Sequence, residues 1–180
     1  MLKCPETLDW QFGKELVKYL GGDYSIVKPG WCWGEFAKHF PHLREKAERY
    51  FEKAKTGDPA WAAYQMCRYC GSSRDWAEKV IEKAKTGDPA WAAYHMRKEC
   101  GSSREWAEKV IEEAKTGNPA LAAYRMYKYF GSSKDWAKKV IEKAETGDPA
   151  WAAYWMYRGC GSSREWAKKI CEKWKKNYIK

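Results

Sequence analysis

A cysteine pair is the first feature of this sequence that suggests chemistry. Cys67 and Cys70 form its one Cys-x-x-Cys pair, and such pairs supply zinc ligands or redox-active thiols. A structural zinc site needs two further ligands, and no second pair with this spacing exists. A later copy of the same segment has Phe130 in the place of Cys70, so this position accepts a large apolar group. We therefore predict buried structural cysteines and no metal site.

Histidines and a carboxylate gather further upstream. Glu35, His39 and His42 lie near a predicted helix end, one turn after Cys32. Their spacing matches no recognised metal motif, and Pro41 bends the chain between the histidines. We predict no metal at this cluster either.

The third histidine is isolated. His95 stands at a position that varies between copies of a repeat, and we interpret it as a surface or groove contact rather than a catalytic base. No nucleophile with a base and an orienting partner is recognisable, and no glycine-rich phosphate loop occurs. The sequence predicts no catalysis and no cofactor.

Binding is the function that the remaining pattern favours. Three positions vary between the copies and a fourth is always basic, as Lys38, Arg68, Lys98, Lys128 and Arg158. The predicted partner-binding residues are Gln65, Arg68, Tyr69, His95, Arg97, Lys98, Arg125, Tyr127, Lys128, Trp155, Tyr157 and Arg158. Cys67, Glu99, Tyr129 and Gly159 complete the variable columns. The alternative is that exposed positions drifted freely after duplication.

A repeat of 30 residues positions these side chains. The motif TGDPAWAAY begins at Thr56, Thr86 and Thr146, and TGNPALAAY begins at Thr116. Units this short stack into an array with a continuous core. The predicted fold is all-α, an αα-hairpin solenoid with a right-handed superhelix and about 11 helices.

Each repeat contains two helix signals. Asp58 before Pro59 predicts a helix A from Pro59 to about Cys70, which Gly71 ends. Ser72 with Asp75 resembles a capping box and predicts a helix B over residues 73–85.

The two predicted helices differ in their faces. Helix B has an apolar stripe with Trp76, Val80 and Ile81 opposite a charged, solvated face. Helix A is apolar almost all round, so we expect it between neighbouring helices, with Trp61 buried between repeats rather than forming a stacking platform.

We predict one domain with distinct ends. Its parts are a capping helix within residues 1–26, a diverged repeat at 27–56, repeats at 57–86, 87–116 and 117–146, and a last repeat with its cap at 147–180. Lys46 in place of the repeated tryptophan and Trp174 in place of a repeated alanine indicate capped ends and a monomer.

Composition narrows the class of protein. The mean hydropathy is -0.82 and no long apolar run occurs, so we predict no membrane span. Seven cysteines and no signal-like N-terminus favour a reducing, cytoplasmic location. The net charge is +10, but residues 161–180 hold seven lysines and arginines against two glutamates, so much of the charge belongs to one end.

The spacing of Ala77, Ile81, Ala84 and Pro89 resembles the small-large-small-proline pattern of tetratricopeptide repeats. The wider architecture is similar to that of the superfamily that includes pentatricopeptide proteins. The likeness covers about 150 residues, although tetratricopeptide units have about 34 residues and a Leu-Gly pair that this helix A lacks. The resemblance implies a scaffold that holds an extended partner in a groove.

Three functional hypotheses remain. The first is a protein or peptide scaffold, whose basic column holds acidic groups. The second is binding of single-stranded RNA or another nucleic acid, one base per repeat. The third is homotypic assembly through exposed ends.

Overall fold

The computed structural model describes residues 44–55, 57–176, 178 and 179. This part of the chain contains helices and no strands, as predicted for an all-α fold. The helices are α3 (Arg44–Glu52), α4 (Pro59–Cys70), α5 (Arg74–Lys83), α6 (Pro89–Glu99), α7 (Arg104–Glu113), α8 (Pro119–Phe130), α9 (Lys134–Lys143), α10 (Pro149–Cys160) and α11 (Arg164–Lys173). The predicted capping helix and the first half of the diverged repeat lie outside the described residues.

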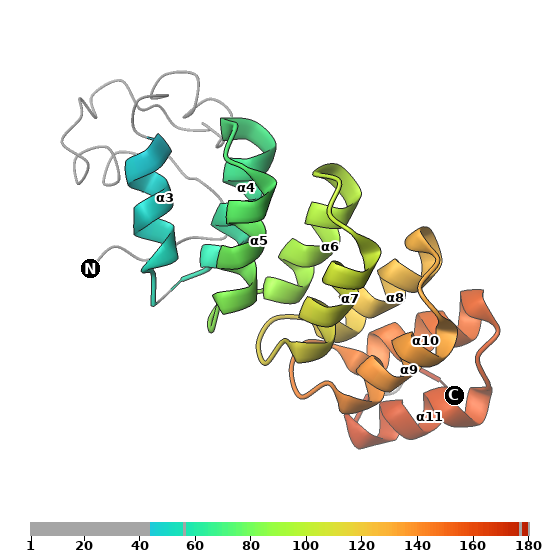
Figure 1. Cartoon of the computed structure of the whole chain (residues 1–180). Coiled ribbons are helices and arrows are strands. Elements are labelled where there is room, and N and C mark those ends of the chain that lie inside the picture. Colours follow the sequence, from blue (N-terminus) through green and yellow to red (C-terminus); the bar gives the residue numbers. More distant parts are fainter. Residues whose placement is uncertain (1–43, 56, 177, 180) are drawn as a thin grey trace, which may run out of the picture.

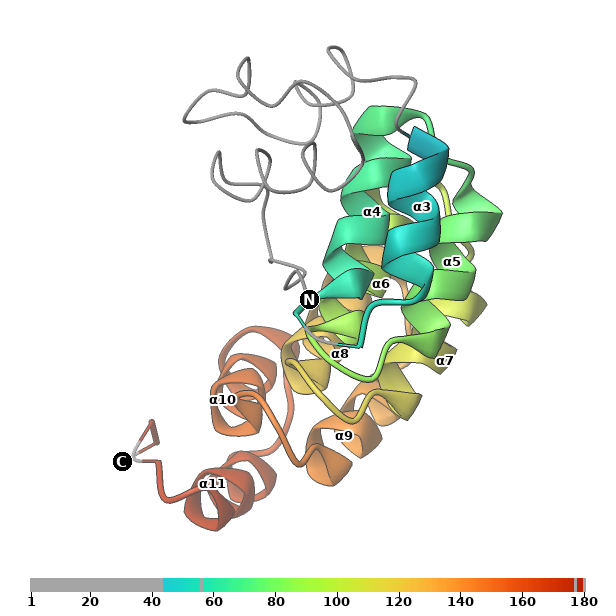
Figure 2. The same cartoon turned by 90° about the vertical axis from the view of Figure 1, so that its left-hand side faces the viewer.

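The helices form an elongated row of pairs that runs from α3 to α11 (Figure 1). We call α4, α6, α8 and α10 the A helices and α3, α5, α7, α9 and α11 the B helices. Each A helix packs against the B helix that follows it and against the next A helix, and each B helix also packs against the next A helix. Consecutive helices are therefore neighbours in space, which Figure 2 shows from the side.

The A helices begin where the sequence predicts. The Asp58 carboxylate caps α4, because its Oδ1 accepts a hydrogen bond from the Trp61 backbone N–H at 2.9 Å. Its Oδ2 accepts a second bond, at 3.0 Å, from the backbone N–H of Asp88, which is the equivalent residue of the next repeat. Asp88 repeats both contacts toward Trp91 and Asn118. Each cap thus also fixes the loop that starts the next repeat.

The B helices differ from the prediction at both ends. Ser73, not Ser72, is the N-cap of α5, and its Oγ accepts a hydrogen bond from the Trp76 backbone N–H. Ser72 is buried, and its hydroxyl donates to Glu48 Oε1 at 2.6 Å. Two adjacent serines offer the same capping group, so only the backbone path decides between them. The helix ends at Lys83 rather than Lys85, because Ala84 adopts an extended backbone with ψ 124°.

The core is rich in alanine and also contains methionine, isoleucine and tyrosine side chains. Fully buried positions recur in each repeat, including Ala62, Ala63, Met66, Ala77 and Ile81. Alanines allow helix backbones to approach closely, which ridge-and-groove packing requires. The prediction that the helix A tryptophans are buried is wrong in degree, since Trp61, Trp91 and Trp151 are half-buried. They pack against the core with one side and leave the other accessible.

Aromatic side chains cover the C-terminal end of the row. Trp174 and Ile179 pack against the core cluster. The Tyr178 hydroxyl donates to Asp148 Oδ2 at 3.1 Å. In the preceding repeats the backbone N–H 30 residues later occupies that acceptor, so the tyrosine replaces the contact of a further repeat. None of the described helices has the length and hydrophobicity that a membrane span requires.

Candidate partner-binding surface

The variable position in the middle of α6 and of α8 rests on aromatic rings of the preceding repeat. The His95 ring centroid lies 5.2 Å from those of Trp61 and Tyr64. In the next repeat, the Arg125 guanidinium lies 4.9 Å from the Trp91 ring centroid. At these two junctions the recurring tryptophan and tyrosine therefore support a side chain that changes from repeat to repeat. The attraction between a guanidinium and an aromatic ring stabilises this contact between neighbouring repeats.

His95 lies among four aromatic rings. Besides the two rings of α4, it contacts its own Trp91 and Tyr94 at centroid distances of 5.1 Å. Burial and, to a smaller degree, the nearby cations Lys98, Arg125 and Arg68 together lower the pKa of His95 to about 4. Its Nδ1 lies 3.4 Å from Glu99 Oε1 but has no hydrogen-bond partner among the described residues. At neutral pH His95 is therefore an uncharged ring rather than part of an ion pair.

A polar network joins α4 to α6 beside this histidine. The Tyr64 hydroxyl donates to Glu99 Oε2 at 2.6 Å and accepts from Arg68 Nη1 at 2.7 Å. Arg68 also forms an ion pair with Glu99, and Lys98 Nζ lies 3.4 Å from Glu99 Oε1. Burial raises the pKa of Tyr64, so its phenol keeps the proton that it donates. One carboxylate thus engages two members of the predicted basic column.

The surface between α8 and α10 has a different charge. Lys128 Nζ lies 5.7 Å from the Tyr124 ring centroid and 5.2 Å from that of Tyr129. No carboxylate pairs with Lys128, Arg125 or Arg158 within the described part of the chain. The helices α8 and α10 also contain no Asp or Glu. This end of the A-helix face is therefore cationic.

Large hydrophobic side chains are exposed along the same face. Tyr129 is 57% exposed, Tyr69 41% and Trp155 38%. Trp155 contacts its own Trp151 and Tyr154 at ring centroid distances of 5.6 and 5.5 Å. The A helices therefore present aromatic and cationic groups together at their C-terminal halves.

Some predicted site residues do not reach this surface. Arg97, Tyr127 and Tyr157 are half-buried, and the two tyrosines pack against the core. Arg97 Nη1 donates a hydrogen bond to the backbone carbonyl of Ser102 in the same repeat at 3.1 Å, and the Arg97 guanidinium lies over the Phe130 ring of the next repeat. Arg97, Tyr127 and Tyr157 stand at equivalent positions of their A helices. This position contributes to packing rather than to the exposed face, since Arg97 contacts Phe130 of the next repeat and the two tyrosines pack against the core. Gln65 is also half-buried, whereas the following predicted residues are exposed: Arg68, Tyr69, Lys98, Lys128, Trp155 and Arg158.

Sequence reasoning missed the residues that link the repeats. Tyr64 and Glu99 are 35 positions apart, and the Trp106 indole N–H donates to Glu82 of the preceding B helix at 2.9 Å. Arg74 Nη1 donates to the Gly101 carbonyl at the end of α6. The Trp–Glu and Arg–Gly pairs recur at fixed separations, since Trp166 meets Glu142 and Arg104 meets Gly131 in the same way, and this recurrence is the available signal. The Tyr64–Glu99 pair has no such signal, because Glu99 occurs in one copy.

The cysteines show no metal-binding arrangement in the described residues, where no group of three or more metal-ligating side chains occurs. Cys67 lies on α4, and Cys100 is the C-cap residue of α6, the next A helix. The hydrogen bond between their thiols lowers the pKa of Cys67 and raises that of Cys100. The upstream cluster of Glu35, His39 and His42 lies outside the described residues.

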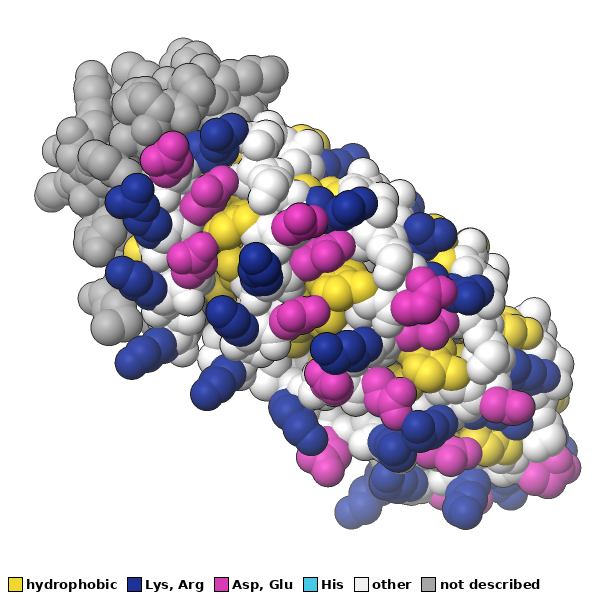
Figure 3. Space-filling model, in the orientation of Figure 1, with side chains coloured by type: hydrophobic (Ala, Val, Ile, Leu, Met, Phe, Trp, Pro, Cys, Tyr) yellow, Lys and Arg dark blue, Asp and Glu magenta, His cyan; other side chains and the backbone are white. Residues whose placement is uncertain are grey.

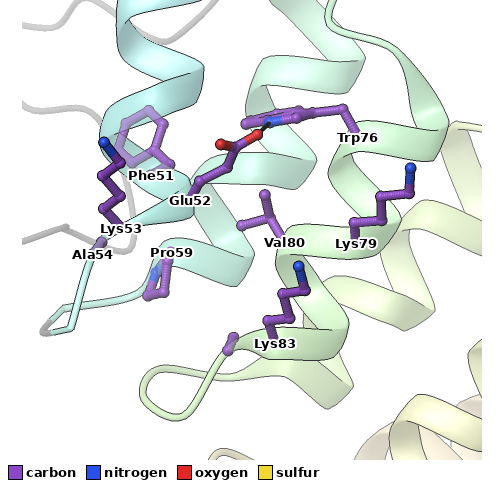
Figure 4. A pocket seen from close by; sticks show the side chains of 10 residues that line it. Phe51, Glu52, Lys53, Ala54, Pro59, Trp76, Lys79, Val80 and Lys83 are labelled. Carbon is purple, nitrogen blue, oxygen red and sulfur yellow. Dashed lines mark hydrogen bonds between the residues drawn. The ribbon is translucent and has the colours of Figure 1, made fainter.

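A second candidate surface is a series of crevices between consecutive B helices. The crevice between α3 and α5 has a volume of about 310 Å³. Phe51, Pro59 and Val80 line it, with Lys79 and Lys83 at its rim (Figure 4). Equivalent crevices of about 390 and 330 Å³ follow along the row, and the face in Figure 3 carries intermixed acidic and basic side chains around hydrophobic patches. Because the crevices recur with the repeat, we interpret them as seams between repeats.

Comparison with known proteins adds no assignment. No family model matches the chain, and searches of the curated proteins and of the solved structures return no similar protein. The resemblance to tetratricopeptide repeats therefore stays a prediction.

Proposed function

We propose that this protein is a non-catalytic scaffold that binds an extended protein or peptide segment across the C-terminal halves of its A helices. The observation that carries the proposal is the joint exposure of Tyr129, Trp155 and Lys128 on one face. Exposed aromatic residues with nearby cations are typical of binding surfaces, since they offer apolar area and hydrogen-bond donors at low entropic cost.

The proposed function also requires a particular arrangement of the helices. We propose that the helix pairs continue as a right-handed αα-hairpin solenoid of about 11 helices, with a groove along the A helices. Repeat arrays expose long surfaces of this kind. With units spaced by roughly 10 Å, five of them offer about 50 Å, which matches an extended peptide of about 15 residues.

A protein ligand fits this surface better than RNA. A single-stranded nucleic acid needs cations along its whole path, but Glu99 engages both Arg68 and Lys98. The unpaired cations lie mainly at α8 and α10. We therefore propose an acidic and hydrophobic peptide as the partner class, and keep RNA as an outcome of the test.

The test is selection of ligands from a display library of random 16-residue peptides. We expect enriched peptides that contain acidic and hydrophobic residues, and we expect Trp155→Ala to weaken their binding by about tenfold or more. Lys109→Ala is the matched control, because Lys109 is exposed on the B helix α7. Circular dichroism checks that both variants keep their helices.

Two results would contradict the proposal. One is a library without enriched peptides, and the other is binding that Trp155→Ala leaves unchanged. A pool of 16-nucleotide single-stranded RNA serves as the competing probe at physiological salt. RNA binding that depends on Lys128 and survives this salt would replace the peptide by a nucleic acid.

A further inference from the structure

Two junctions between A helices have a tyrosine and a cation at equivalent positions of their first helix, but they differ in the residue of the second helix that corresponds to Glu99. Tyr64 and Arg68 on α4 correspond to Tyr124 and Lys128 on α8. Glu99, which meets the first pair, corresponds to Gly159 at the second junction. The α4/α6 junction therefore serves as an internal reference for the α8/α10 junction.

The carboxylate of Glu99 fills the α4/α6 junction. It accepts the Tyr64 hydroxyl at 2.6 Å and pairs with the Arg68 guanidinium, which also donates to the Tyr64 oxygen at 2.7 Å. The phenol thus bridges the cation and the anion. A tyrosine, a cation one turn later and a carboxylate form one bonded set.

The α8/α10 junction holds the same two donors without the carboxylate. Lys128 Nζ lies 5.7 Å from the Tyr124 ring centroid and 5.2 Å from that of Tyr129, and these two phenols raise the pKa of Lys128. Because an ammonium only donates, the Tyr124 hydroxyl keeps its proton for another acceptor. The Tyr124 side chain is 5% exposed, so neighbouring helices fix its position.

Gly159 leaves open space at this junction. It is exposed and lies within α10, and a Cβ built on it meets no atom within 4 Å. Trp155 lies one turn earlier on α10 and is partly exposed, while Tyr129 follows Lys128 directly. Aromatic surface therefore flanks the position that corresponds to the Glu99 carboxylate.

We propose that the α8/α10 junction is a binding site for an aspartate or glutamate side chain of a peptide ligand, held by Tyr124 and Lys128 as Tyr64 and Arg68 hold Glu99. This inference rests on the proposed peptide-binding function and names its anchor. One hydroxyl and one ammonium suit a single carboxylate, which accepts charge-assisted hydrogen bonds on both oxygens. Hydrophobic residues next to the acid contact Trp155 and Tyr129.

The first experiment fills the site from within the chain. Gly159→Glu places a carboxylate where Glu99 has one, and Gly159→Gln is its uncharged control with the same gain in helix propensity. We expect Gly159→Glu to melt about 2 °C above Gly159→Gln. The difference should vanish in the Lys128→Met background. Equal melting of the two variants in the natural background would overturn the proposed geometry.

The second experiment uses blocked tripeptides and nuclear magnetic resonance. N-acetyl-Ala-Glu-Ala-amide should shift the Gly159 amide and Trp155 indole signals, and its Gln counterpart should bind about tenfold more weakly. N-acetyl-Ala-Gln-Ala with a free C-terminus tests whether the bound carboxylate is a chain terminus rather than a side chain. If this peptide binds more tightly than N-acetyl-Ala-Glu-Ala-amide, the side-chain assignment is overturned. Gly159→Glu should abolish the shift of the Trp155 indole signal, and Lys109→Met should leave both shifts unchanged.

The two proposals fail in different ways. If display-selected peptides bind and require Trp155 but are insensitive to Gly159→Glu and Lys128→Met, the carboxylate site is wrong and the scaffold function stands. If the blocked Glu tripeptide binds at Gly159 but the 16-residue library yields no binding peptide, the carboxylate site stands and the extended groove is wrong. Equal binding of the Glu and Gln tripeptides would refute the site directly.

Discussion

His95 takes its properties from two repeats at once. Its ring lies between the tryptophan and tyrosine of α4 and those of α6. Burial favours the neutral imidazole, which lowers its pKa to about 4 from the ordinary value of 6.5. The sequence predicted a contact residue at this position, but its burial depends on neighbours 31 and 34 positions away.

This histidine predicts a pH dependence of stability. Its folded pKa is below the unfolded one, so the unfolded state binds protons more readily between these values. The contribution to the free energy of unfolding is complete above pH 6.5 and is lost as the pH falls toward 4. His95→Gln, which copies Gln65, should remove this part of the dependence. Urea unfolding at several pH values measures it, and identical pH profiles for both proteins would contradict the assignment.

The capping aspartates act on two repeats with one side chain. Asp88 caps α6 through Oδ1 and holds the Asn118 backbone N–H through Oδ2 at 3.0 Å. Asn118 has one acceptor oxygen, so its Oδ1 makes both contacts, at 3.2 and 3.4 Å. The cap was predictable from Asp before Pro, whereas the second bond was not.

We expect Asp88→Ala to lower the free energy of unfolding by about 2 kcal/mol, since it removes a cap and leaves a loop N–H without its acceptor. Asp88→Asn should cost less than half of this amount, because Asn118 fills the same role naturally. Denaturant titration measures both. Equal losses for the two variants would show that the second bond contributes nothing.

Glycines at the start of each repeat set how closely the elements stack. Gly117 has φ +78°, and a Cβ there would lie 2.6 Å from the Asp88 Cα and overlap its carboxyl group. Gly101, at the turn after α6, has a similar φ of +75° but meets nothing within 4 Å. A side chain at Gly101 would therefore meet backbone strain alone, whereas a side chain at Gly117 would meet the same strain and also collide with Asp88.

Gly101→Ala should cost about 1 kcal/mol, because an L side chain disfavours this left-handed backbone. Gly117→Ala should cost at least about 2 kcal/mol more, since it also forces the Asp88 cap away from α6. Thermal and denaturant unfolding of the pair provide the comparison. If both variants lose the same stability, the close approach between repeats has no energetic weight.

In the last described repeat, a tyrosine hydroxyl occupies the capping acceptor that the backbone N–H of the next repeat uses elsewhere. Tyr178 donates to Asp148 and packs against Tyr154 with ring centroids 6.2 Å apart. In an array each repeat contacts only its neighbours, so the loss of an end contact acts first on the nearest helices. The cap predicted from Trp174 is compatible with this arrangement, and the predicted monomer remains a prediction.

Tyr178→Ala should therefore speed amide hydrogen exchange in α10 and α11 and leave α4 and α5 unchanged. Hydrogen exchange followed by mass spectrometry resolves the two ends of the row. Tyr178→Phe is the control that keeps the ring and removes only the bond to Asp148. Uniform acceleration along the whole chain would contradict local coupling and indicate a single cooperative unit.

The sequence by itself determined the elements of this protein. Pro59 after Asp58, Gly71 after Cys70 and the apolar stripe of helix B act within a few residues, so local rules place the helices and their buried faces. The repeat also identified which positions vary. These conclusions need no knowledge of how one repeat sits on the next.

The tertiary structure alone decided which variable residues meet. Tyr64 reaches Glu99, Arg97 turns toward Phe130, and Gly159 leaves Lys128 without a carboxylate. Each relation depends on the offset between stacked A helices, which no local propensity encodes. The candidate carboxylate site follows from that offset, since it places an internal glutamate at one junction and open space at another.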